Sequence, residues 1–339
     1  MKAVAYYEPK AISESDSLID VELPEPTAGE RDLIVHVHAV SVNPVDTKVR
    51  KSRKAEGGQP VVLGWDATGV VKSVGSKVTM FKPGDRVWYA GNLIRPGTNS
   101  EYHAVDERIV GRMPKTLDFA DAAALPLTSI TAWELLFDRL EVPTEKGGKS
   151  GSLMIVGAAG GVGSIMIQLA RKLTGLTVIA TASRPETQAW VKELGAHHTV
   201  DHTKPLAEEL KRIGIPEVEY IASLNQTDHH FPQIAESLAP QGKVGLIDDP
   251  ELFDVRLLKR KSGSLHWELM YTRSLYDTAD QIKQHDLLCK VAEMIDDGTL
   301  RTTAGEHFGK VNAANLKRAH ALIESNRAKG KIVLEGFGV

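Results

Sequence analysis

The sequence predicts an α/β protein in which an antiparallel β domain carries an inserted, doubly wound parallel sheet of six strands. Three observations favour this class. Short alternating strands fill residues 1–126, strands and helices alternate over 127–275, and a glycine-rich loop joins a strand to a helix within that second region. Residues 276–339 return to helices and a closing strand. We therefore expect one domain at 1–126 with 276–339, and a dinucleotide-binding domain at 127–275.

The first region reads as an antiparallel sheet. DLIVHVHAVSV at 32–42 alternates apolar and polar residues, which is typical of a half-buried strand. Strands are expected in the same way at 67–75 and 85–91. Between them, KPGD at 82–85 supplies the proline and glycine of a tight turn.

The middle region has the rhythm of a parallel sheet with helical crossovers. LMIV at 153–156 is a continuous apolar run, as in strands that are covered on both faces. A helix follows, because apolar residues fall on one of its faces: Val162, Ile165, Met166, Leu169, Ala170 and Leu173. The remaining strands are expected at 177–181, 198–200, 218–222, 243–247 and 264–270, with helices at 186–195, 205–213 and 229–238. Gly195 is expected as a left-handed cap after the first of these helices.

The last region is expected to contain two helices and a strand. The helices are predicted at 277–296 and 312–326, and KIVLE at 331–335 is the closing strand. The middle domain is therefore expected to be an insertion, and we expect residues 276–339 to pack back on the first half.

The stretch GAAGGVG at 157–163 has the context of a dinucleotide phosphate site, since a strand precedes it and an amphipathic helix follows. Gly157 permits the sharp turn, Gly160 and Gly161 let the backbone approach a pyrophosphate, and Gly163 allows close packing of the helix. The helix N-terminus offers free N–H groups and a positive dipole end. The expected cofactor-binding residues of the loop are Gly157, Ala158, Gly160, Gly161, Val162 and Gly163.

The end of the second strand of this sheet favours NADPH over NADH. An acidic residue there would bond the ribose 2′-OH of NAD, but TASRPE at 181–186 holds no carboxylate before Glu186. Ser183 and Arg184 suit a 2′-phosphate, because the guanidinium pairs with phosphate oxygens. The alternative is a capping box in which Ser183 is the N-cap and Glu186 returns to it, and Ser183 can serve both roles.

Composition excludes several classes of protein. The chain has 339 residues, with 42% hydrophobic and 25% charged residues, which are ordinary globular values. The formal net charge of −3 gives no basic face for nucleic acid and no polybasic stretch for a membrane. No run of 18 apolar residues and no apolar signal core is present. Cys289 is the single cysteine, so an intrachain disulfide and a thiolate metal cluster are excluded. We expect a soluble cytoplasmic protein.

The order of these parts resembles the medium-chain dehydrogenase/reductase superfamily. The resemblance covers nearly the whole chain and lies in VSVNPVDTKVR (40–50), GWDATGVV (64–71), SVGSKVTMFKPGDRVW (73–88), LPLTSITAWELL (125–136), the glycine loop and GKIVL (330–334). Within the superfamily the chain resembles the quinone oxidoreductase branch, particularly bacterial proteins labelled zinc-type alcohol dehydrogenase-like. This implies a GroES-like β domain with an inserted Rossmann domain, and a homodimer whose cofactor sheets pair through their last strands.

The zinc ligands of the superfamily are missing from this chain. Zinc alcohol dehydrogenases hold the catalytic metal with a Cys, a His from a Gly-His-Glu stretch, and a third ligand. The corresponding positions here are Asn43 and Gly64-Trp65-Asp66, and tryptophan has no lone pair for a metal. The four-cysteine structural lobe is absent as well. No metal is therefore expected.

The remaining histidine pairs do not restore a metal site. His197-His198 and His229-His230 sit beside predicted strands or helix starts, and adjacent side chains diverge. We expect them to be surface residues rather than ligands.

Hydride transfer without a metal needs an acceptor that is already electrophilic, such as a quinone or an α,β-unsaturated carbonyl. The hypothesis is an NADPH-dependent reductase of such substrates, acting in the cleft between the domains. The catalytic candidates are Asn43, Asp46, Lys48 and Thr128. Asn43 is read either as a partner of the substrate carbonyl or nicotinamide ribose, or as part of a turn with Asp46.

Three further readings depend on the resemblance. Lys48 stands where relatives often carry a tyrosine, so it replaces that proton donor or is simply solvated. Thr128 resembles a residue beside the nicotinamide, with a helix-capping role as the alternative. Asp66 is expected to organise its loop by hydrogen bonds. Further cofactor contacts are expected from strand ends and from the closing strand: Ser223, Asn225, Ile247 and Lys331.

Two other functions stay open at the sequence level. One is an alcohol or carbonyl dehydrogenase that uses another metal arrangement. The other is a non-catalytic NADPH-binding redox sensor. Metal analysis, alcohol-dependent NADP⁺ reduction and turnover on electrophilic acceptors distinguish the three.

Overall fold

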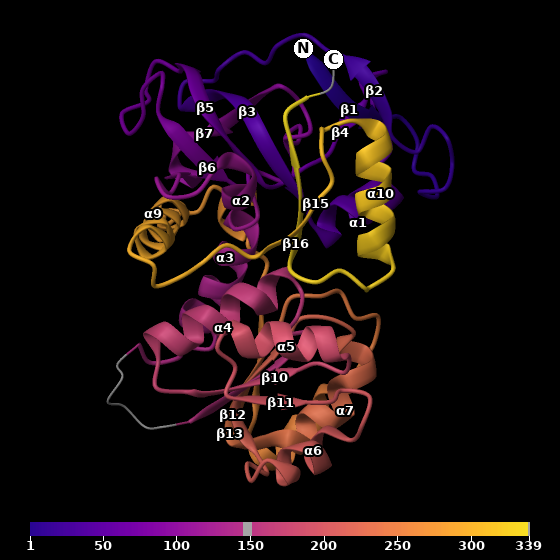
Figure 1. Ribbon diagram of the computed structural model, residues 1–339, viewed down its shortest axis with the longest axis vertical. Coiled ribbons are helices and arrows are strands. Elements are labelled where there is room, and N and C mark those ends of the chain that lie inside the picture. The colour runs from indigo at the N-terminus through magenta and orange to yellow at the C-terminus, as the bar shows by residue number, and fades with distance from the viewer. Residues whose placement is uncertain (145–150, 338–339) are drawn as a thin grey trace. The chain divides into compact units, whose positions relative to one another are not determined.

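The chain divides into two compact units in the computed structural model, which describes residues 1–144 and 151–337. Unit 1 comprises Met1–Leu127 and Tyr271–Val339, and unit 2 is the segment Thr128–Met270. Unit 2 is therefore an insertion in the chain of unit 1, and the colours of Figure 1 show the first and last segments of the chain together in unit 1. Among the described residues, no helix is long and apolar enough to cross a membrane.

Unit 1 is built mainly of antiparallel strands, as the alternating sequence predicts. Its larger sheet has the order β15-β16-β3-β5-β6-β8, with β7 also paired to β3, and its smaller sheet has the order β2-β1-β4. The larger sheet contains β3 (Asp32–Val42), β5 (Ala67–Val74), β6 (Arg86–Tyr89), β7 (Tyr102–Asp106), β8 (Val110–Arg112), β15 (Ala304–His307) and β16 (Lys331–Glu335). The smaller sheet contains β1 (Lys2–Tyr6), β2 (Ile19–Glu22) and β4 (Val61–Val62).

The predicted closing strand is confirmed and ties the end of the chain to its beginning. β16 pairs antiparallel with β3, with Ile332 opposite Val42 and Leu334 opposite Val40. Both strands are buried, because their apolar side chains pack within the unit. This pairing places the end of β3, which Asn43 follows, beside the start of β16, where Lys331 lies.

One helix of unit 1 begins clearly later than predicted. They are α1 (Pro44–Ser52), η1 (Glu107–Ile109), α2 (Phe119–Ala123), α8 (Thr272–Leu275), α9 (Lys283–Asp296) and α10 (Ala313–Glu324), and α3 (Pro126–Trp133) crosses into unit 2. The helix expected at 277–296 begins only at Lys283. Asp277 has a left-handed φ of 45°, and the Thr278 hydroxyl donates to the Asp280 carboxylate at 2.7 Å, so the chain turns before the helix begins.

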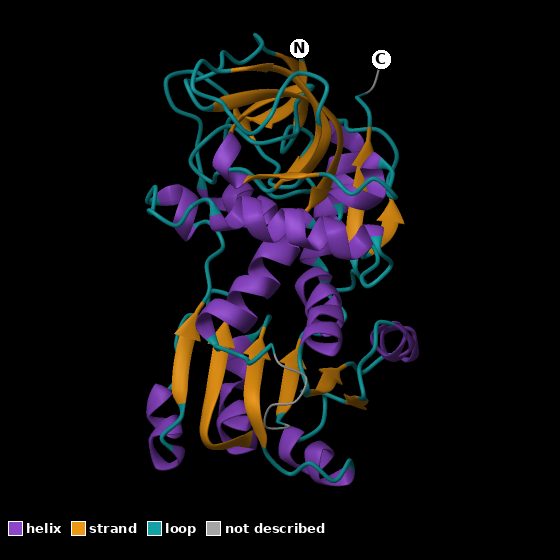
Figure 2. Cartoon of the chain, turned by 90° about the vertical axis from the view of Figure 1, so that its left-hand side faces the viewer, coloured by secondary structure: helices purple, strands orange, loops and turns teal. Residues whose placement is uncertain are grey.

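Unit 2 is the doubly wound sheet that the sequence predicts. All six strands are parallel, in the order β11-β10-β9-β12-β13-β14, which is the dinucleotide-binding order with its reversal beside the first strand. They are β9 (Ser152–Val156), β10 (Thr177–Thr181), β11 (His198–Val200), β12 (Val218–Ser223), β13 (Leu238–Leu246) and β14 (Ser264–Trp267). Figure 2 shows the strands side by side with helices on both sides of the sheet.

The crossovers of unit 2 are short helices. They are η2 (Glu134–Arg139), α4 (Gly161–Leu173), α5 (Pro185–Glu193), α6 (Leu206–Arg212), α7 (Thr227–Ser237) and η3 (Val255–Lys261), of which η2 is a π-helix. Apolar residues of the strands and of α6 and α7 form one core cluster, including Met154, Ile221, Phe231 and Leu246. Helix burial against the sheet, rather than helix propensity, stabilises elements this short.

Two local predictions about α5 have opposite outcomes. Gly195 has φ +111°, so the left-handed glycine after this helix is confirmed. The capping box is wrong: the helix begins at Pro185 with Arg184 as its N-cap residue, and no side chain caps it. Proline at the first helical position lacks the N–H that a cap would satisfy, so the expected Ser183 cap is displaced by one residue.

Candidate functional site

The glycine loop turns sharply between β9 and α4. Gly157 has φ +81°, a conformation that favours glycine, and its N–H donates to the Thr181 hydroxyl at 3.1 Å. The Gly160 N–H donates to the Gly157 carbonyl at 3.2 Å, and Gly160 is the N-cap residue of α4. The end of β10 therefore holds the loop in place, and the loop feeds directly into a helix N-terminus.

Two glycines of the loop have different surroundings. A Cβ at Gly163 would lie 2.4 Å from the Ala158 carbonyl oxygen, so only glycine lets α4 pack this closely on the loop. A Cβ at Gly160 would meet nothing nearer than the Gly157 oxygen at 3.5 Å, so the space beside Gly160 is open. The first N–H groups of α4 have no acceptor within the helix and carry its positive dipole end. These residues fit the pyrophosphate of a dinucleotide.

The end of β10 presents Ser183 and Arg184, both half-buried, directly after the strand. The Arg184 Nε lies 3.3 Å from the Glu186 carboxylate, and Glu186 is exposed in the first turn of α5. No carboxylate stands at the strand end itself, where it would face a ribose 2′-OH.

The strand ends farther along the sheet are held by a hydrogen-bond network. The Ser223 hydroxyl is buried and lies 2.7 Å from that of Thr227, and the Thr227 N–H donates to the Asp248 carboxylate at 2.8 Å. Asn225 is exposed, and Ile247 is half-buried directly after β13. The side chain of Ser223 is thus engaged within the network, and Asp248 is its acceptor.

A buried polar cluster in unit 1 joins Ser41, Asn43, Asp66 and Lys331. One Asp66 oxygen accepts hydrogen bonds from Ser41 Oγ at 2.9 Å, Asn43 Nδ2 at 2.8 Å and Lys331 Nζ at 3.0 Å. Its other oxygen accepts the Leu127 N–H at 2.7 Å. The expectation that Asp66 organises its loop by hydrogen bonds is confirmed.

The structure places the Lys331 side chain inside this cluster. Its side chain is 3% exposed, and Nζ donates to the Val42 carbonyl at 3.1 Å, to Asn43 Oδ1 and to Asp66. An ammonium has three N–H donors, so all of them are used inside unit 1. The Lys331 side chain is therefore fully hydrogen-bonded within this cluster.

Asp46 and Tyr271 lie at the margin of the same cluster. Asp46 Oδ2 accepts the Asn43 N–H at 2.6 Å, and burial raises the pKa of its carboxyl to about 7. The Tyr271 hydroxyl is buried near Asp46 and Asp66, and burial, reinforced by these two carboxylates, raises its pKa well above the ordinary value. Tyr271 escaped sequence analysis because nothing in the spacing of SLHWELMY links it to Asn43.

The remaining catalytic candidates lie on helices. Lys48 is exposed on α1, and Thr128 is buried at the third position of α3, which begins at Pro126. Asn43 is the N-cap residue of α1, so the turn expected at NPVD continues as a helix. Proline at the first helical position explains this, because its φ is already helical.

The residues at the superfamily zinc positions do not fit the metal. Trp65 is fully buried, and its indole N–H donates to the Asn92 carbonyl at 3.2 Å. Lys331 donates a hydrogen bond to Asn43 and forms an ion pair with Asp66, so a positive charge already lies beside both residues. Within residues 1–144 and 151–337, no three His, Cys, Asp or Glu side chains are grouped to hold a metal ion.

One prediction about the histidine pairs is wrong. His197 and His229 are exposed and His198 is half-exposed, but His230 is only 4% exposed. The first turn of α7 faces the core on one side, and residues one position apart on a helix point about 100° apart, so His229 reaches solvent while His230 does not.

Unit 2 contains a buried acid pair that the sequence did not indicate. Glu134 on η2 and Glu268 directly after β14 are both buried, and their carboxyls hydrogen-bond to each other. The Arg139 Nε donates to Glu268 Oε2 at 2.8 Å. Burial, followed by the neighbouring Glu134, raises the pKa of Glu268 to about 8. The π-helical turn brings Glu134 and Arg139 onto the same side, which an α-helical reading of the sequence would not predict.

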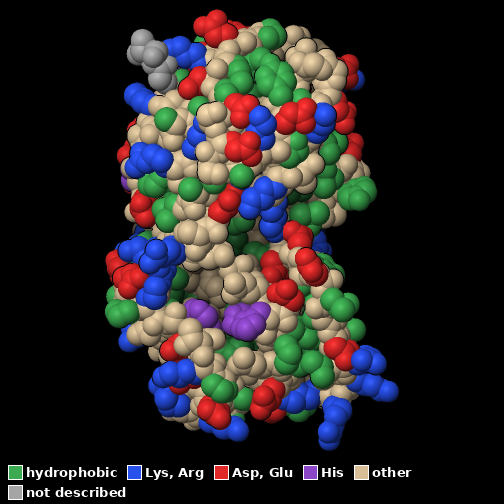
Figure 3. All heavy atoms as spheres, turned by 90° about the vertical axis from the view of Figure 1, so that its right-hand side faces the viewer, with side chains coloured by type: hydrophobic (Ala, Val, Ile, Leu, Met, Phe, Trp, Pro, Cys, Tyr) green, Lys and Arg blue, Asp and Glu red, His purple; other side chains and the backbone are tan. Residues whose placement is uncertain are grey.

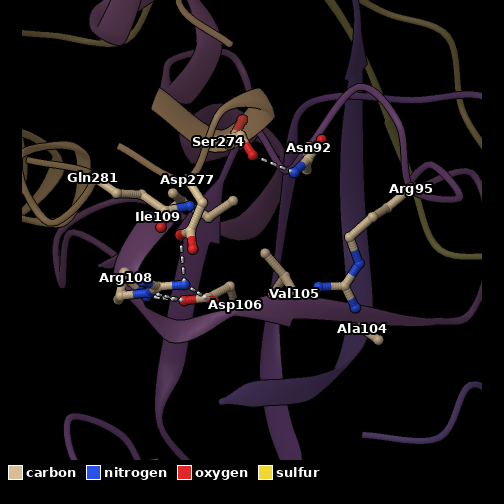
Figure 4. A pocket seen from close by; sticks show the side chains of 10 residues that line it. All are labelled: Asn92, Arg95, Ala104, Val105, Asp106, Arg108, Ile109, Ser274, Asp277 and Gln281. Atoms are coloured by element: carbon tan, nitrogen blue, oxygen red, sulfur yellow. Dashed lines mark hydrogen bonds and ion pairs between the residues drawn. The ribbon is translucent and has the colours of Figure 1, made fainter. Parts of the chain in front are cut away.

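A small cavity of 140 Å³ lies in unit 1, and none of the residues of the cluster around Asp66 lines it. Figure 4 shows Arg108 paired with Asp106 and Asp277. Arg95 pairs with Asp32, which lies outside the lining residues. The lining residues are Asn92, Arg95, Ala104, Val105, Asp106, Arg108, Ile109, Ser274, Asp277 and Gln281. Since both guanidiniums are already neutralised by carboxylates, the cavity selects no particular ligand charge.

Two protein-family models match the chain. The alcohol dehydrogenase GroES-like domain matches residues 29–115, and the zinc-binding dehydrogenase model matches residues 194–334. A zinc-type alcohol dehydrogenase-like protein of Staphylococcus aureus (strain MSSA476) is 38% identical over 338 residues, which are 98% of this chain and 99% of that protein. The chloroplastic NADPH-dependent alkenal/one oxidoreductase of Arabidopsis thaliana is 38% identical over 193 residues, 55% of this chain and 48% of that protein.

Solved structures show the same fold. A "zinc-dependent alcohol dehydrogenase protein" from Rhizobium etli CFN 42 is 56% identical, with a TM-score of 0.96 over 100% of this chain and 99% of that one. The quinone oxidoreductase of Coxiella burnetii is 25% identical, with a TM-score of 0.80 over 99% of each chain. The quinone oxidoreductase of Escherichia coli in complex with NADPH is 22% identical, with a TM-score of 0.82 over 99% of this chain and 100% of that one, a likeness of fold alone.

Proposed function

The chain belongs to the medium-chain dehydrogenase/reductase superfamily, among its zinc-type alcohol dehydrogenase-like proteins, and from this we propose that it is an NADPH-dependent reductase of quinones or α,β-unsaturated carbonyls that works without zinc. The observation that carries the proposal is the glycine loop of unit 2. Its turn at Gly157, its open face at Gly160 and the helix N-terminus behind it form a cradle for a dinucleotide pyrophosphate.

The choice of NADPH rests on the end of β10. Ser183 and Arg184 stand where an NAD-specific site would hold a carboxylate, and a guanidinium pairs with phosphate oxygens. The name of the Arabidopsis relative, which includes NADPH and alkenal/one, supports the same cofactor and substrate class. Ala158, Gly161 and Val162 of the loop, with Asn225 and Ile247 at the neighbouring strand ends, are the further residues we propose for cofactor binding.

The proposal of a zinc-free reaction rests on the cluster around Asp66. The names of several relatives include zinc. In this chain the ammonium group of Lys331 lies beside Asn43 and Asp66, and Trp65 stands at the position of the ligating histidine. NADPH, when bound, supplies the hydride, and the acceptor must already be electrophilic because no metal polarises it. Asn43, Asp46, Lys48 and Thr128 stay candidates for orienting the substrate and for handling its proton.

The exposed edge of unit 2 supports the proposal of a homodimer. β14 is the last strand of the sheet, and among the described residues its outer edge pairs with no strand. Trp267 and Leu269 are 53% and 50% exposed beside this edge. A second copy that pairs through β14 would cover both the unpaired backbone groups and the apolar side chains. A monomer by light scattering at micromolar concentration would contradict this assembly.

The test is steady-state turnover by the purified, untagged protein with NADPH and with NADH, on quinones, enones, aldehydes and alcohols. We expect oxidation of NADPH with quinones or enones, a lower efficiency with NADH, and no dependence on added zinc or chelator. Stoichiometric bound zinc together with alcohol-dependent NADP⁺ reduction would favour an alcohol dehydrogenase instead. Tight NADPH binding without turnover on any acceptor would favour a redox sensor.

Gly160→Ala tests whether the glycine loop is the cofactor site. Gly160 has φ −74°, and its new Cβ would make only an ordinary contact inside the protein, so we expect a folded variant. That Cβ would stand where the pyrophosphate approaches, so NADPH affinity should fall at least tenfold, or ~1.4 kcal/mol. Gly214→Asn is the matched control, because Gly214 has φ +78° and open space around it. An unchanged affinity in Gly160→Ala would place the cofactor elsewhere.

A further inference from the structure

The 140 Å³ cavity of unit 1 is lined by side chains that donate and accept hydrogen bonds. Its walls come from the loop after β6, from β7 with η1, and from residues 274–281, all of them in unit 1. The proposed function gives these residues no role. On the face that Figure 3 draws, acidic and basic side chains lie among one another, so charge alone marks no binding surface there. The cavity is distinguished instead by its hydrogen-bonding groups.

Gln281 presents a buried oxygen to this cavity. The residue is 4% exposed and belongs to the lining, and its Oε1 atom accepts no hydrogen bond from any described residue. Its backbone is fixed, because the Gln281 N–H donates to the Thr278 carbonyl and the Gln281 carbonyl accepts the Gln284 N–H. Buried side-chain oxygens are seldom left unsatisfied, so this atom indicates a bound molecule that donates to it.

The two arginines of the lining have donors beyond those that their carboxylate partners use. Arg108 donates from Nε and Nη2 to Asp106 at 2.9 and 2.8 Å, and its Nη2 lies 3.1 Å from Asp277. Arg95 donates from Nη1 and Nη2 to Asp32 at 2.9 and 2.7 Å. A guanidinium carries five N–H donors, so both groups have donors left for a ligand.

The pairing of these charges favours an uncharged ligand. Figure 4 shows Gln281, Asp277 and Arg108 on one side of the cavity and Arg95 on the other. Each guanidinium is already paired with a carboxylate. A bound anion would compete with that carboxylate, and a bound cation would lie beside a guanidinium. An uncharged molecule avoids both costs.

The size of the cavity and its mixture of donors and acceptors narrow the chemistry further. A volume of 140 Å³ is large enough for several water molecules. A molecule with three or four carbon atoms can therefore take their place. A hydroxyl group both donates and accepts, so neighbouring hydroxyls match an unfilled acceptor at Gln281 and the spare donors of Arg108.

We propose that this cavity binds a small uncharged polyol, either free or as the hydroxyl-bearing end of a sugar. One hydroxyl donates to Gln281 Oε1, and a neighbouring hydroxyl accepts a hydrogen bond from the Arg108 guanidinium. The site includes none of the residues proposed for the cofactor or for catalysis. It is therefore independent of the proposed function.

The experiment is saturation-transfer NMR on the purified full chain in a buffer without polyols, titrated with glycerol, erythritol and methyl glucoside. We expect saturable binding with a dissociation constant of about 1–10 mM, because a ligand this small makes few contacts. Tighter binding of methyl glucoside than of glycerol and erythritol identifies the end of a sugar as the ligand. The reverse order identifies a free polyol.

Two variants alter the cavity in different ways. Gln281→Leu removes the buried acceptor, and we expect a folded protein because Oε1 accepts no hydrogen bond from the described residues. Ala104→Val adds bulk to the wall and leaves every polar group in place. Each should weaken polyol binding at least tenfold. Gln59→Leu, at an exposed glutamine of unit 1, is the matched control and should bind like wild type. Thermal unfolding without polyol checks that all three variants are folded.

Two results would overturn the proposal. One is the absence of saturable binding of any of the three compounds to wild type, which would mean that the cavity holds water only. The other is wild-type affinity in both Gln281→Leu and Ala104→Val, which would place the polyol elsewhere. These measurements need neither NADPH nor turnover, so their failure leaves the proposed function standing, and a lack of turnover leaves the polyol site standing.

Discussion

Each unit buries a cluster of charged side chains, and the two clusters differ in how their acids and cations are paired. In unit 1, the Lys331 ammonium meets the Val42 carbonyl, Asn43 and Asp66, so each of its donors has an acceptor. In unit 2, the buried carboxyls of Glu134 and Glu268 hydrogen-bond to each other, and Glu268 pairs with the guanidinium of Arg139. The first cluster is complete as an ion pair, whereas the second holds one acid more than it can neutralise.

The difference shows how a buried cluster responds to pH. A buried ion pair with all its hydrogen bonds made stays charged, because removing either charge leaves the other uncompensated. Two neighbouring buried carboxyls instead keep a proton, since both cannot ionise at short range. We therefore expect the pair of Asp66 and Lys331 to contribute through the presence of both charges, and the contribution of the two glutamates of unit 2 to depend on the pH.

Removing Lys331 should have the largest effect on stability. Lys331→Met keeps a similar volume but leaves Asp66 as a buried carboxylate without its cation, which should lower the free energy of unfolding by about 3–5 kcal/mol. Urea or thermal unfolding at pH 7 measures this. Lys82→Met, at an exposed lysine, should change it by less than about 0.5 kcal/mol. A loss no larger than that of the control would mean that the cluster around Asp66 contributes little.

Glu134→Gln should produce a smaller effect, confined to high pH. The pKa of Glu268 is raised from 4.5 to about 8 in the folded protein, so the folded state holds a proton that the unfolded state loses. The contribution of this group to the free energy of unfolding is therefore fully present below pH 4.5 and is lost as the pH rises through 8. The glutamine amide can donate to an ionised Glu268, which then pairs with Arg139. The variant should be about 1–2 kcal/mol more stable than wild type at pH 9 and nearly equal at pH 5.

The same measurement on an exposed glutamate is the control for Glu134→Gln. Glu208→Gln on α6 should track wild type at every pH, because that carboxyl is exposed. A Glu134→Gln profile that parallels wild type would show that the two acids do not share a proton.

Asp46→Asn should give the smallest change in stability. It tests whether a second buried carboxyl of unit 1, beside the pair of Asp66 and Lys331, responds to the pH. The pKa of Asp46 is raised to about 7 by burial, so its contribution to stability is present in acid and declines as the pH passes 7. Asparagine can still accept the Asn43 N–H. We expect the variant to match wild type at pH 5 and to gain less than about 1 kcal/mol at pH 9. A variant less stable than wild type at pH 9 would show that ionised Asp46 is stabilised by partners.

The elements that the sequence indicated best are those with long, clean periodicity. The strand at 32–42 and the glycine loop with its helix lie where the pattern places them, because side-chain alternation and bare backbone are local properties. The errors have local causes too. Left-handed Asp277 delays the start of α9, and Pro185 moves the N-cap of α5 from Ser183 to Arg184.

The residues that sequence analysis missed are those whose environment depends on tertiary contacts. Tyr271, Glu134 and Glu268 are polar residues whose neighbours in the fold stand far along the chain. Lys331 was expected as a cofactor contact, and its sequence neighbours do not reveal that β16 pairs with β3 and brings it beside Asp66. A lysine becomes a structural cation only when acceptors surround it.

The sequence by itself determined the class of fold, the position of the phosphate-binding turn and the absence of a carboxylate after β10, since these follow from periodicity, glycine and composition within short windows. Only the tertiary structure decided which charges are buried and what they meet. Charge burial depends on which segments lie side by side, and the pairing of β16 with β3 and of β11 with β10 joins residues that are not adjacent in the chain. Hydrophobic periodicity predicts that a strand is buried, but the identity of its neighbour, and hence the chemistry of the site, is fixed when the sheets assemble.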